Sequence, residues 1–200
     1  EHTVSRRDID VEALKVLYRL HHAGYTAYLV GGGVRDLLLG KTPKDFDVVT
    51  DARPGELRKL FRNSRIIGRR FRLVQVFFKG GHIVEVSTFR RRSEFDELAE
   101  NEASPAKETT YGTPAEDAPR RDLTINGLFY NIGDFSLVDY VGGMEDLAAK
   151  RIRVIGEPSV RFERDPVRML RVLRHAARIG FTIDAAAWKE IMAQGHLIRT

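Results

Sequence analysis

The chain has 200 residues, of which 42% are hydrophobic and 30% charged, and it holds no run of about 18 apolar residues, which excludes a membrane-spanning helix. Cysteine is absent, which excludes disulfides and thiolate metal sites and fits a reducing, cytoplasmic location, and the start of the chain lacks the apolar segment of a secretory signal. The net charge of +5 at pH 7 favours an anionic partner, most often nucleic acid, although many basic proteins bind no particular anion.

The first half of the chain alternates helical and β-type segments. Apolar residues recur at helical spacing from Val11 to His22, and Gly24 follows them. Further helices are predicted at residues 31–39, closed by Gly40, and at 54–61. Strands are predicted at residues 26–30, 46–50, 65–68, 73–78 and 82–89, with a hairpin turn at 79–81.

An acidic segment interrupts this pattern. Residues 93–118 hold eight acidic residues and one lysine, a net charge of −7 that leaves +12 for the rest of the chain. Because the segment is poor in large apolar side chains, we expect a mobile loop. Such a loop is either a solvated linker or a competitor of nucleic acid for the basic surface.

Helices dominate the end of the chain. Residues 122–130 predict a helix that runs into a strand, and a turn at Gly142-Gly143, a short helix at 145–149 and a strand at 151–156 follow. The longest predicted helix covers residues 165–179, and another begins after Asp184, a typical N-cap. We therefore predict an α+β fold: a mixed sheet with flanking helices over residues 1–156, and a helical segment over 157–200.

Two aspartates one residue apart, Asp45 and Asp47, predict a metal site. On a strand both side chains leave the same face, and two like charges held so close favour a cation between them. Mg²⁺ is the natural ion, and two ions roughly 4 Å apart can catalyse a phosphoryl displacement. Glu85 would be the third carboxylate if Val84 and Val86 face the core. The alternative is a pair of solvated turn residues.

Three glycines precede these aspartates. In the stretch from Gly31 to Gly33, backbone N–H groups and a helix N-terminus can face phosphates, while Arg35 adds a fixed positive charge. The alternative is a plain strand-to-helix turn. The stretch is neither a Walker loop nor a dinucleotide-binding fingerprint, since Asp36 stands where the last glycine would be.

The helix at 165–179 has a basic side. At 100° per residue, Arg168, Arg171, Arg174 and Arg178 fall within a sector of roughly 120°. The other half of the helix is apolar, includes Leu170 and Leu173, and is expected to pack. Arginine suits bidentate contact with phosphate or with base edges. A solvated basic face is the ordinary alternative.

Four stretches in the same order resemble the template-independent RNA nucleotidyltransferases, which are the bacterial poly(A) polymerases and the CCA-adding tRNA nucleotidyltransferases. They are LVGGGVRDLLLGKTPKDFDVVT (29–50), RRDLTINGLFY (120–130), DYVGGMEDL (139–147) and DPVRMLRVLRHAARIGF (165–181). The resemblance implies a nucleotidyltransferase head over residues 1–156 and the start of a helical neck at 157–200, joined by a hinge at DYVGGMEDL. The family usually carries further helical segments, so the chain is expected to be truncated.

The resemblance also assigns roles to residues. By resemblance, Asp45 and Asp47 are the catalytic carboxylates that hold two Mg²⁺ ions, for which Mn²⁺ can substitute. Glu85, chosen from the strand alternation, and Asp122 complete the expected catalytic set. Nucleotide-binding residues would be Gly31, Gly32, Arg35, Arg121, Asp122, Asn126, Asp165, Arg168, Arg171 and Arg174. For Asp122 the alternative is a stabilising carboxylate in the first turn of a helix. The motif around Asp165 departs from the family pattern, because Arg164 stands where the family has an acid.

The stretch from Ile66 to Phe77 favours poly(A) polymerase, because the basic pair before Phe71 resembles that group. The partners would be ATP and an RNA 3′ end. The alternatives are a CCA-adding enzyme, which shares the catalytic site, and an inactive nucleotide- or RNA-binding protein, which Arg164 suggests.

Overall fold

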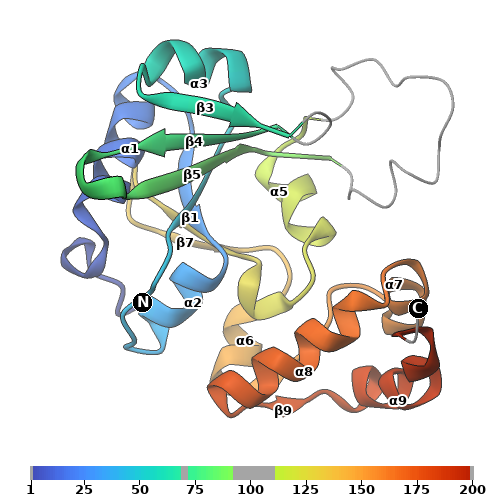
Figure 1. Cartoon of the computed structure of the whole chain (residues 1–200). Helices are drawn as coiled ribbons and strands as arrows, with labels where there is room; N and C mark the ends of the chain where they lie inside the picture. The colour runs from blue at the N-terminus through green and yellow to red at the C-terminus, as the bar shows by residue number, and fades with distance from the viewer. Residues whose placement is uncertain (1, 69–71, 92–110, 199–200) are drawn as a thin grey trace, which may run out of the picture.

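The chain folds around one large mixed sheet (Figure 1). The structure, a computed structural model, describes residues 2–68, 72–91 and 111–198. Seven strands pair in the order β3-β4-β5-β2-β1-β6-β7, in which β2 and β5 run parallel and the other neighbours antiparallel. The strands are β1 (Ala27–Val30), β2 (Asp47–Thr50), β3 (Ser64–Ile67), β4 (Leu73–Phe77), β5 (Ile83–Thr88), β6 (Leu128–Asn131) and β7 (Leu137–Asp139). The predicted mixed sheet is therefore confirmed.

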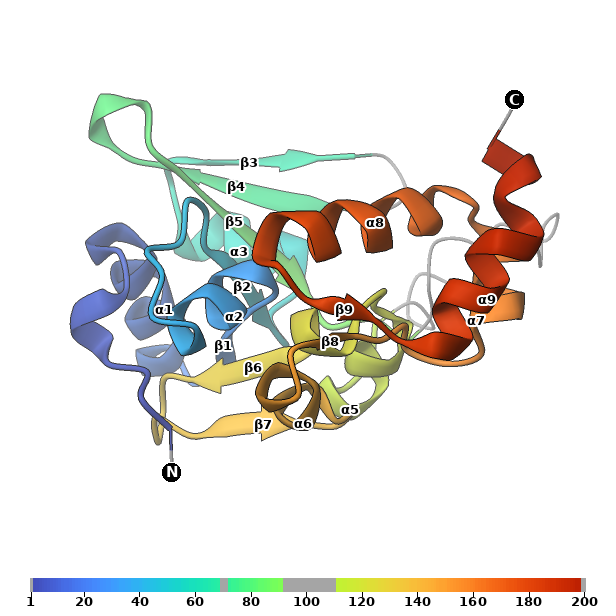
Figure 2. The same ribbon diagram turned by 90° about the horizontal axis from the view of Figure 1, so that it is seen from below.

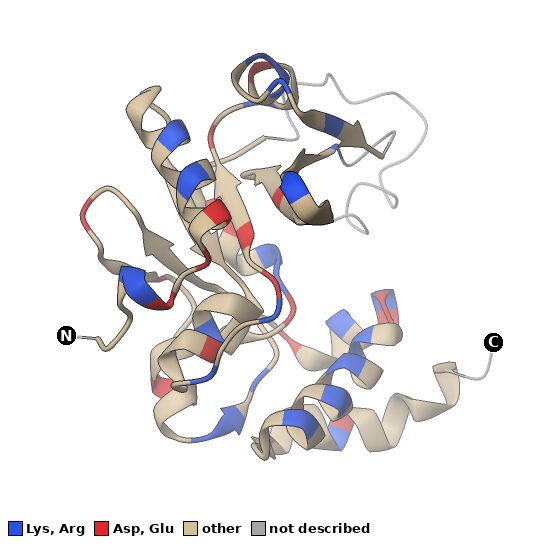
Figure 3. Ribbon diagram, turned by 60° about the vertical axis from the view of Figure 1, so that its left-hand side comes forward, with Lys and Arg blue, Asp and Glu red and all other residues tan. Residues whose placement is uncertain are grey.

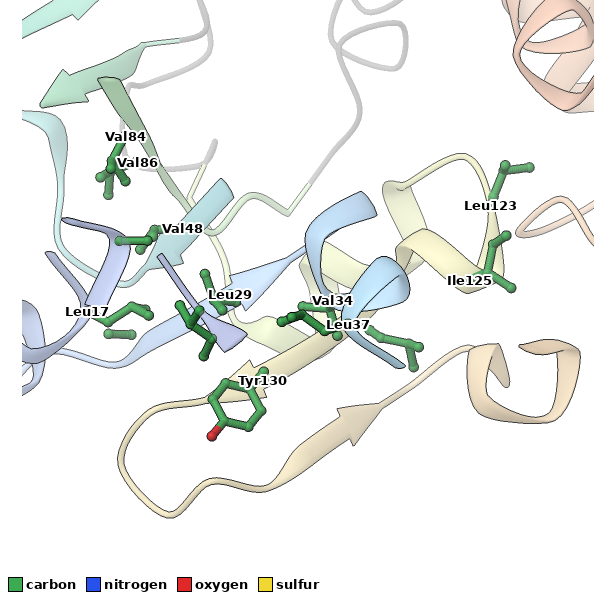
Figure 4. Packing of buried hydrophobic residues seen from close by; sticks show 14 of the residues in the cluster. Leu17, Leu29, Val34, Leu37, Val48, Val84, Val86, Leu123, Ile125 and Tyr130 are labelled. Atoms are coloured by element: carbon green, nitrogen blue, oxygen red, sulfur yellow. The ribbon is translucent and has the colours of Figure 1, made fainter. Parts of the chain in front are cut away.

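The main core lies on the face of the sheet that α1, α2 and α3 cover. These helices are α1 (Val11–His22), α2 (Gly32–Leu38) and α3 (Pro54–Leu60). Helix α1 has the predicted bounds, and the carboxylate of Asp10 caps it by accepting the backbone N–H groups of Glu12 and Ala13. Figure 4 shows Leu17 of α1 with Leu29 and Val48 of the sheet, all at most 1% exposed. The opposite face carries a smaller cluster: Val30, Val49, Phe89, Ala118 and Phe129.

The acidic segment is only partly as predicted. Residues 93–110 lie outside the described residues, but Pro114–Asp117 forms helix α5, and Tyr111 bridges to Arg90. Asp117 is fully buried and forms ion pairs with two arginines that follow it. The prediction of a loop is thus wrong at the C-terminal end of this segment, because one of its acids is buried and paired with arginines instead of being solvated by water.

Two further helical predictions need correction. The helix expected within residues 122–130 is a single 3₁₀ turn, Thr124–Asn126, directly before β6. The long helix begins at Val167 rather than Asp165, and an unpredicted helix α7 ends at Arg164. Asp165 separates the two helices with a non-helical backbone (φ −141°, ψ 84°), as expected of a residue before proline.

The segment after Gly156 is helical apart from one short strand. The last elements are α6 (Gly143–Ala148), β8 (Arg151–Ile152), α7 (Pro158–Arg164), α8 (Val167–Ile179), β9 (Thr182–Ile183) and α9 (Ala185–Gln194). Asp184 caps α9, as predicted, and β9 pairs in parallel with β8, so a small sheet crosses the predicted domain boundary. Helices α7, α8 and α9 gather away from α3 and β3 in Figure 1, and Figure 2 shows β9 beside β8. No helix in the described ranges combines the length and apolar character of a membrane span.

Close packing fixes the predicted hinge. The carboxylate of Asp139 accepts the backbone N–H groups of Gly142, Gly143 and Met144. A methyl group on Gly143 would collide with the carbonyl oxygen of Thr124 and would lie 3.0 Å from the side chain of Leu128.

We expect Gly143→Ala to reduce the free energy of unfolding by roughly 1–3 kcal/mol, because backbone must move to admit the methyl group. Gly55→Ala in α3 is the matched control. Its methyl group would meet no atom within 4 Å, so it should stabilise the helix by about 0.5–1 kcal/mol. Urea unfolding of the two variants checks both signs, and equal behaviour would contradict the packing argument.

Candidate active site

A polar cleft of about 340 Å³ opens where the β1–α2 turn, the start of β2, the loop before β6 and α8 meet. Its lining consists of charged and amide side chains and two glycines: Gly31, Gly32, Asp47, Arg90, Arg120, Arg121, Asp122, Asn126, Asp165, Arg168 and Arg171. Predicted site residues from four separate segments therefore meet in one place. Asp45, Glu85, Arg35 and Arg174 lie outside this lining.

Asp47 lies beside the glycine bend. It is the first residue of β2, opposite Val30 of β1 and Glu85 of β5. Gly31 has φ +78°, a conformation that glycine adopts without strain, and a Cβ atom there would lie 3.5 Å from Oδ2 of Asp47. The bend and the carboxylate are thus neighbours, as the sequence predicted.

The carboxylates near Asp47 repel one another. Removal of surrounding water and the charges of Glu85 and Asp45 raise the pKa of Asp47, while Arg121 lowers it. No described residue donates a hydrogen bond to the carboxylate of Asp45 or Asp47. Hard carboxylate oxygens without donors fit a divalent cation in this place.

The structure gathers a complete set of three ligand side chains elsewhere. Within the described ranges, Asp10, Glu12 and His82 form the group whose potential ligand atoms all lie within 4.8 Å of one another. Asp10 already caps α1, and the carboxylate of Glu12 contacts Nδ1 of His82. The oxygens of Asp45, Asp47 and Glu85 are spread more widely than this group.

Glu85 leaves the sheet on the side opposite the main core. Val84 and Val86 are 1% and 0% exposed, so alternation along β5 directs Glu85 to the face that carries Asp47. Gln75 of β4 stands directly opposite, and its Nε2 donates a 3.0 Å hydrogen bond to Oε1 of Glu85.

Arg35 occupies a different place from the one expected of a phosphate contact. It is 2% exposed, and its guanidinium donates hydrogen bonds to Asp36 (2.8 and 2.9 Å) and to Oδ1 of Asn126 (2.8 Å). It packs beneath Gly32, where an added Cβ would lie 3.2 Å from its Nη2. In this arrangement Arg35 fixes Asn126 and the glycine turn.

Asp117 fixes two arginines of the cleft. Its oxygens accept hydrogen bonds from Arg120 (2.6 and 2.9 Å) and Arg121 (3.0 Å) and from the backbone N–H of Arg90. Burial alone would raise the pKa of Asp117, but the charges of Arg121 and Arg120 lower it below its usual range. The acid therefore stays ionised and holds both guanidinium groups.

Helix α8 forms the other wall of the cleft, and Figure 3 shows basic positions recurring along it. Asp165 and Arg168 are only 4% and 7% exposed and form an ion pair at 3.2 Å. Arg171 approaches Asp122 at 3.7 Å, while Arg174 is exposed outside the cleft.

Only part of the predicted apolar half of α8 is buried. Met169 and Val172 are buried, but Leu170 and Leu173 are 46% and 36% exposed. His175 packs on the buried side near Asn126, and burial lowers the pKa of its imidazole.

The model of the Poly A polymerase head domain matches residues 27–153. The chain belongs to this family. The match runs from β1 to just after β8, and it therefore includes the glycine bend, Asp47, Glu85 and the arginines held by Asp117.

Related proteins carry two names. Poly(A) polymerase I of Salmonella typhi is 54% identical over 190 residues, which are 92% of this chain and 41% of the relative. The CCA-adding enzyme of Bacillus pumilus is 37% identical over 93% of this chain and 45% of the relative. The chain thus spans less than half the length of these curated relatives.

Solved structures agree with the head-domain fold. The CCA-adding enzyme of Bacillus stearothermophilus, determined in complex with CTP, superposes with a TM-score of 0.79 at 32% identity. The superposition covers 94% of this chain and 44% of that chain.

The reading of the sequence missed three cleft or support residues of this head domain. Arg90 and Arg120 line the cleft, and Asp117 supports Arg120 and Arg121. The available signal was spacing: Asp117 stands three and four residues before two arginines, the distance at which side chains of a helical turn meet.

Proposed function

We propose that this chain is the catalytic part of an RNA nucleotidyltransferase that adds AMP from ATP to RNA 3′ ends without a template. The observation that carries the proposal is the meeting of Asp47 with the Gly31 bend in a cleft rich in arginine. The 54% identity to Poly(A) polymerase I supports ATP as the nucleotide and polyadenylation as the reaction. We place the activity in the cytoplasm, where ATP and RNA meet.

In this reaction the 3′ oxygen of RNA attacks the α-phosphorus of ATP, a new phosphodiester bond forms, and the bond to pyrophosphate breaks. Asp45 and Asp47 would hold Mg²⁺, or Mn²⁺ in its place. The two ions would lower the pKa of the attacking hydroxyl and offset the charge of the leaving phosphates. Glu85, kept in place by Gln75, would add to the negative charge that attracts the ions.

The cations of the cleft would orient the triphosphate. Arg120 and Arg121 are held by Asp117 and line the cleft, so their guanidinium groups are in place before a nucleotide arrives. We infer that Arg35 acts indirectly, because it is buried and donates to Asn126. Asn126 and Asp122 offer groups of the kind that bind a ribose hydroxyl. Arg171 and Arg174 remain proposed phosphate contacts.

Base selection would belong to Asp165 and Arg168. The pair is buried, and Arg168 also donates to the carbonyl oxygen of Arg121 at 3.4 Å, so its guanidinium has little freedom. A fixed set of donors and acceptors rejects a base whose edge leaves them unpaired. Arg164, the departure from the family motif, is exposed at the end of α7 and lies outside the cleft lining.

The alternative is CCA addition, which is favoured by the similarity to CCA-adding enzymes, one of them determined with CTP. A CCA-adding enzyme must accept both CTP and ATP in the same cleft.

We expect labelled ATP to be incorporated into an RNA primer without template at least about 10²-fold more efficiently than CTP, because a hydrogen-bonded base site discriminates strongly. Measuring kcat/KM for each nucleotide checks this, with Asp47→Asn as the inactive control. Efficient use of CTP would support CCA addition instead. ATP binding without incorporation would support a binding protein.

A further inference from the structure

A second cavity of about 620 Å³ lies between α1, the end of α3 and the turn from β4 to β5. Its floor is largely apolar and includes Phe61 and Phe78. Its rim carries Lys15, Arg19, Arg62 and Lys79, and no acidic residue lines it. We call this cavity the basic aromatic pocket.

The pocket is separate from the cleft. Val76, which lines the pocket, is 3% exposed and belongs to the main core, whereas its neighbour Gln75 contacts Glu85 on the opposite face of the sheet. Helices α1 and α3 lie on the side of the molecule away from α8 (Figure 1).

The four cations of the rim lack carboxylate partners among the described residues. The nearby acids of α1, Asp10 and Glu12, face His82 instead. The buried acids elsewhere hold their arginines in ion pairs. The repulsion between these unpaired cations is reduced when a polyanion binds to them, and the polyanion releases its counterions on binding.

The aromatic floor narrows the class of polyanion. The guanidinium of Arg19 lies 5.6 Å from the centre of the Phe61 ring, and Phe78 borders the same space. Cations combined with aromatic rings are typical of sites for single-stranded nucleic acid, where phosphates meet the cations and bases stack. The cavity volume is within the range of pockets that hold a small molecule, which suits a nucleotide unit.

Exposed apolar residues connect the pocket with the carboxylates. Phe77 and Ile83 pair across β4 and β5 and are 38% and 42% exposed. Each lies two residues from Gln75 or Glu85, hence on the same face, and both lead to the turn at Lys79 where the rim begins. A single RNA strand that leaves the cleft past Glu85 would pass Phe77 and Ile83 on its way around the β4–β5 hairpin to the pocket. A short acidic peptide bound only in the pocket would not contact these two side chains.

We propose that the basic aromatic pocket binds the single-stranded RNA primer upstream of its 3′ end, an inference that rests on the proposed function. Lys15 and Arg19 lie one turn apart on α1 and would contact phosphates, while the more accessible rings of the lining, Phe77 and Phe78, would pack against bases. Primers long enough to reach the pocket gain affinity from it, and primers confined to the cleft gain none.

The test is the double variant Lys15→Glu/Arg19→Glu. With an oligoadenylate of about 20 nucleotides we expect KM to rise at least about tenfold at unchanged kcat, and with a trinucleotide primer no change. For the long oligomer, the plot of the logarithm of the association constant against the logarithm of the salt concentration should become less steep by about 1.4, roughly 0.7 for each lost phosphate contact. The control Lys59→Glu/Lys189→Glu has the same charge change on exposed residues outside the pocket and should match the parent protein.

Binding is measured by fluorescence anisotropy in the Asp47→Asn background, so its outcome does not depend on incorporation. A chain that fails to add nucleotides but shows the length-dependent loss would overturn the proposed reaction and keep the pocket. Equal losses with short and long primers, or none with either, would overturn the pocket. The pocket would also be overturned as an RNA site if a labelled oligoglutamate bound there and the double variant left the affinity for the long primer unchanged.

Discussion

Replacement of Asp47 by Asn should reduce nucleotide incorporation by at least about 10²–10³-fold, while the fold is kept and its thermal stability rises. The loss follows because an amide cannot supply the charge that binds a divalent cation beside the reacting phosphate. The variant keeps the shape of the side chain, and Asp47 receives no hydrogen bond from the described residues that the change could break.

The rise in stability follows from the sign of the pKa shift. The pKa of Asp47 is raised in the folded chain by removal of water and by Glu85 and Asp45, so ionisation costs more when folded than when unfolded. Stability is therefore lost as pH rises from the unfolded pKa, about 3.9, through the higher folded pKa. Asparagine does not ionise, so the variant escapes this loss.

The measurement is the melting temperature of both proteins from pH 3 to pH 8 in buffer with a chelator. The gain should be small, no more than about 2–4 °C: neighbouring groups displace part of the water around Asp47, but its side chain is still exposed at the cleft and solvent screens its charge. The gain should vanish at acid pH, and added Mg²⁺ should stabilise the parent protein alone. Asp8→Asn removes an exposed acid outside the cleft lining and should change neither readout. An active Asp47→Asn variant would refute the assignment of the catalytic site.

Local patterns predicted the parts of the site that depend on the backbone alone. Alternation of apolar residues placed Glu85 opposite the core, and the glycine run placed a bend beside Asp47. Both follow from strand geometry and from the conformational range of glycine, which can be inferred from the residue types and their order alone. The match of four ordered motifs gave the family.

The partners of buried charges could not be predicted in the same way. Arg35 was expected to contact phosphate, yet it turns inward to Asp36 and Asn126, and Asn126 is 91 residues away in the chain. Leu170 and Leu173 were expected to pack, yet they are exposed, because α8 uses the sector around Met169 and Val172. These outcomes depend on which elements meet in space, and periodicity within one segment does not contain that information.

Composition misled at Asp117 for a related reason. An average over residues 93–118 describes a solvated acidic stretch, but the fate of each acid depends on its own neighbours. Glu116 is partly exposed and pairs with Arg91, whereas Asp117 is fully buried between Arg120 and Arg121. Two adjacent acids therefore have different energetic roles.

Asp117→Asn should destabilise the fold by about 3 kcal/mol, since it leaves two guanidinium groups without their buried counter-ion. The value lies at the low end for broken buried pairs, because the side chains of Arg120 and Arg121 are 19% and 18% exposed and can turn toward water. Such a turn would move them out of the proposed triphosphate site, so we also expect KM for ATP to rise about tenfold.

Urea unfolding at pH 7 and near pH 3 tests this assignment. The folded pKa of Asp117 is lowered, so its contribution is present above the unfolded value of about 3.9 and is lost as pH falls through the folded value. The gap between parent and variant should therefore narrow in acid. Glu116→Gln is the control: it can keep its helix-capping role and loses only an exposed ion pair, worth at most about 1 kcal/mol. If the two variants lost equal stability, the buried carboxylate would not be what orders the arginines, and the proposed preorganisation of the triphosphate site would need another support.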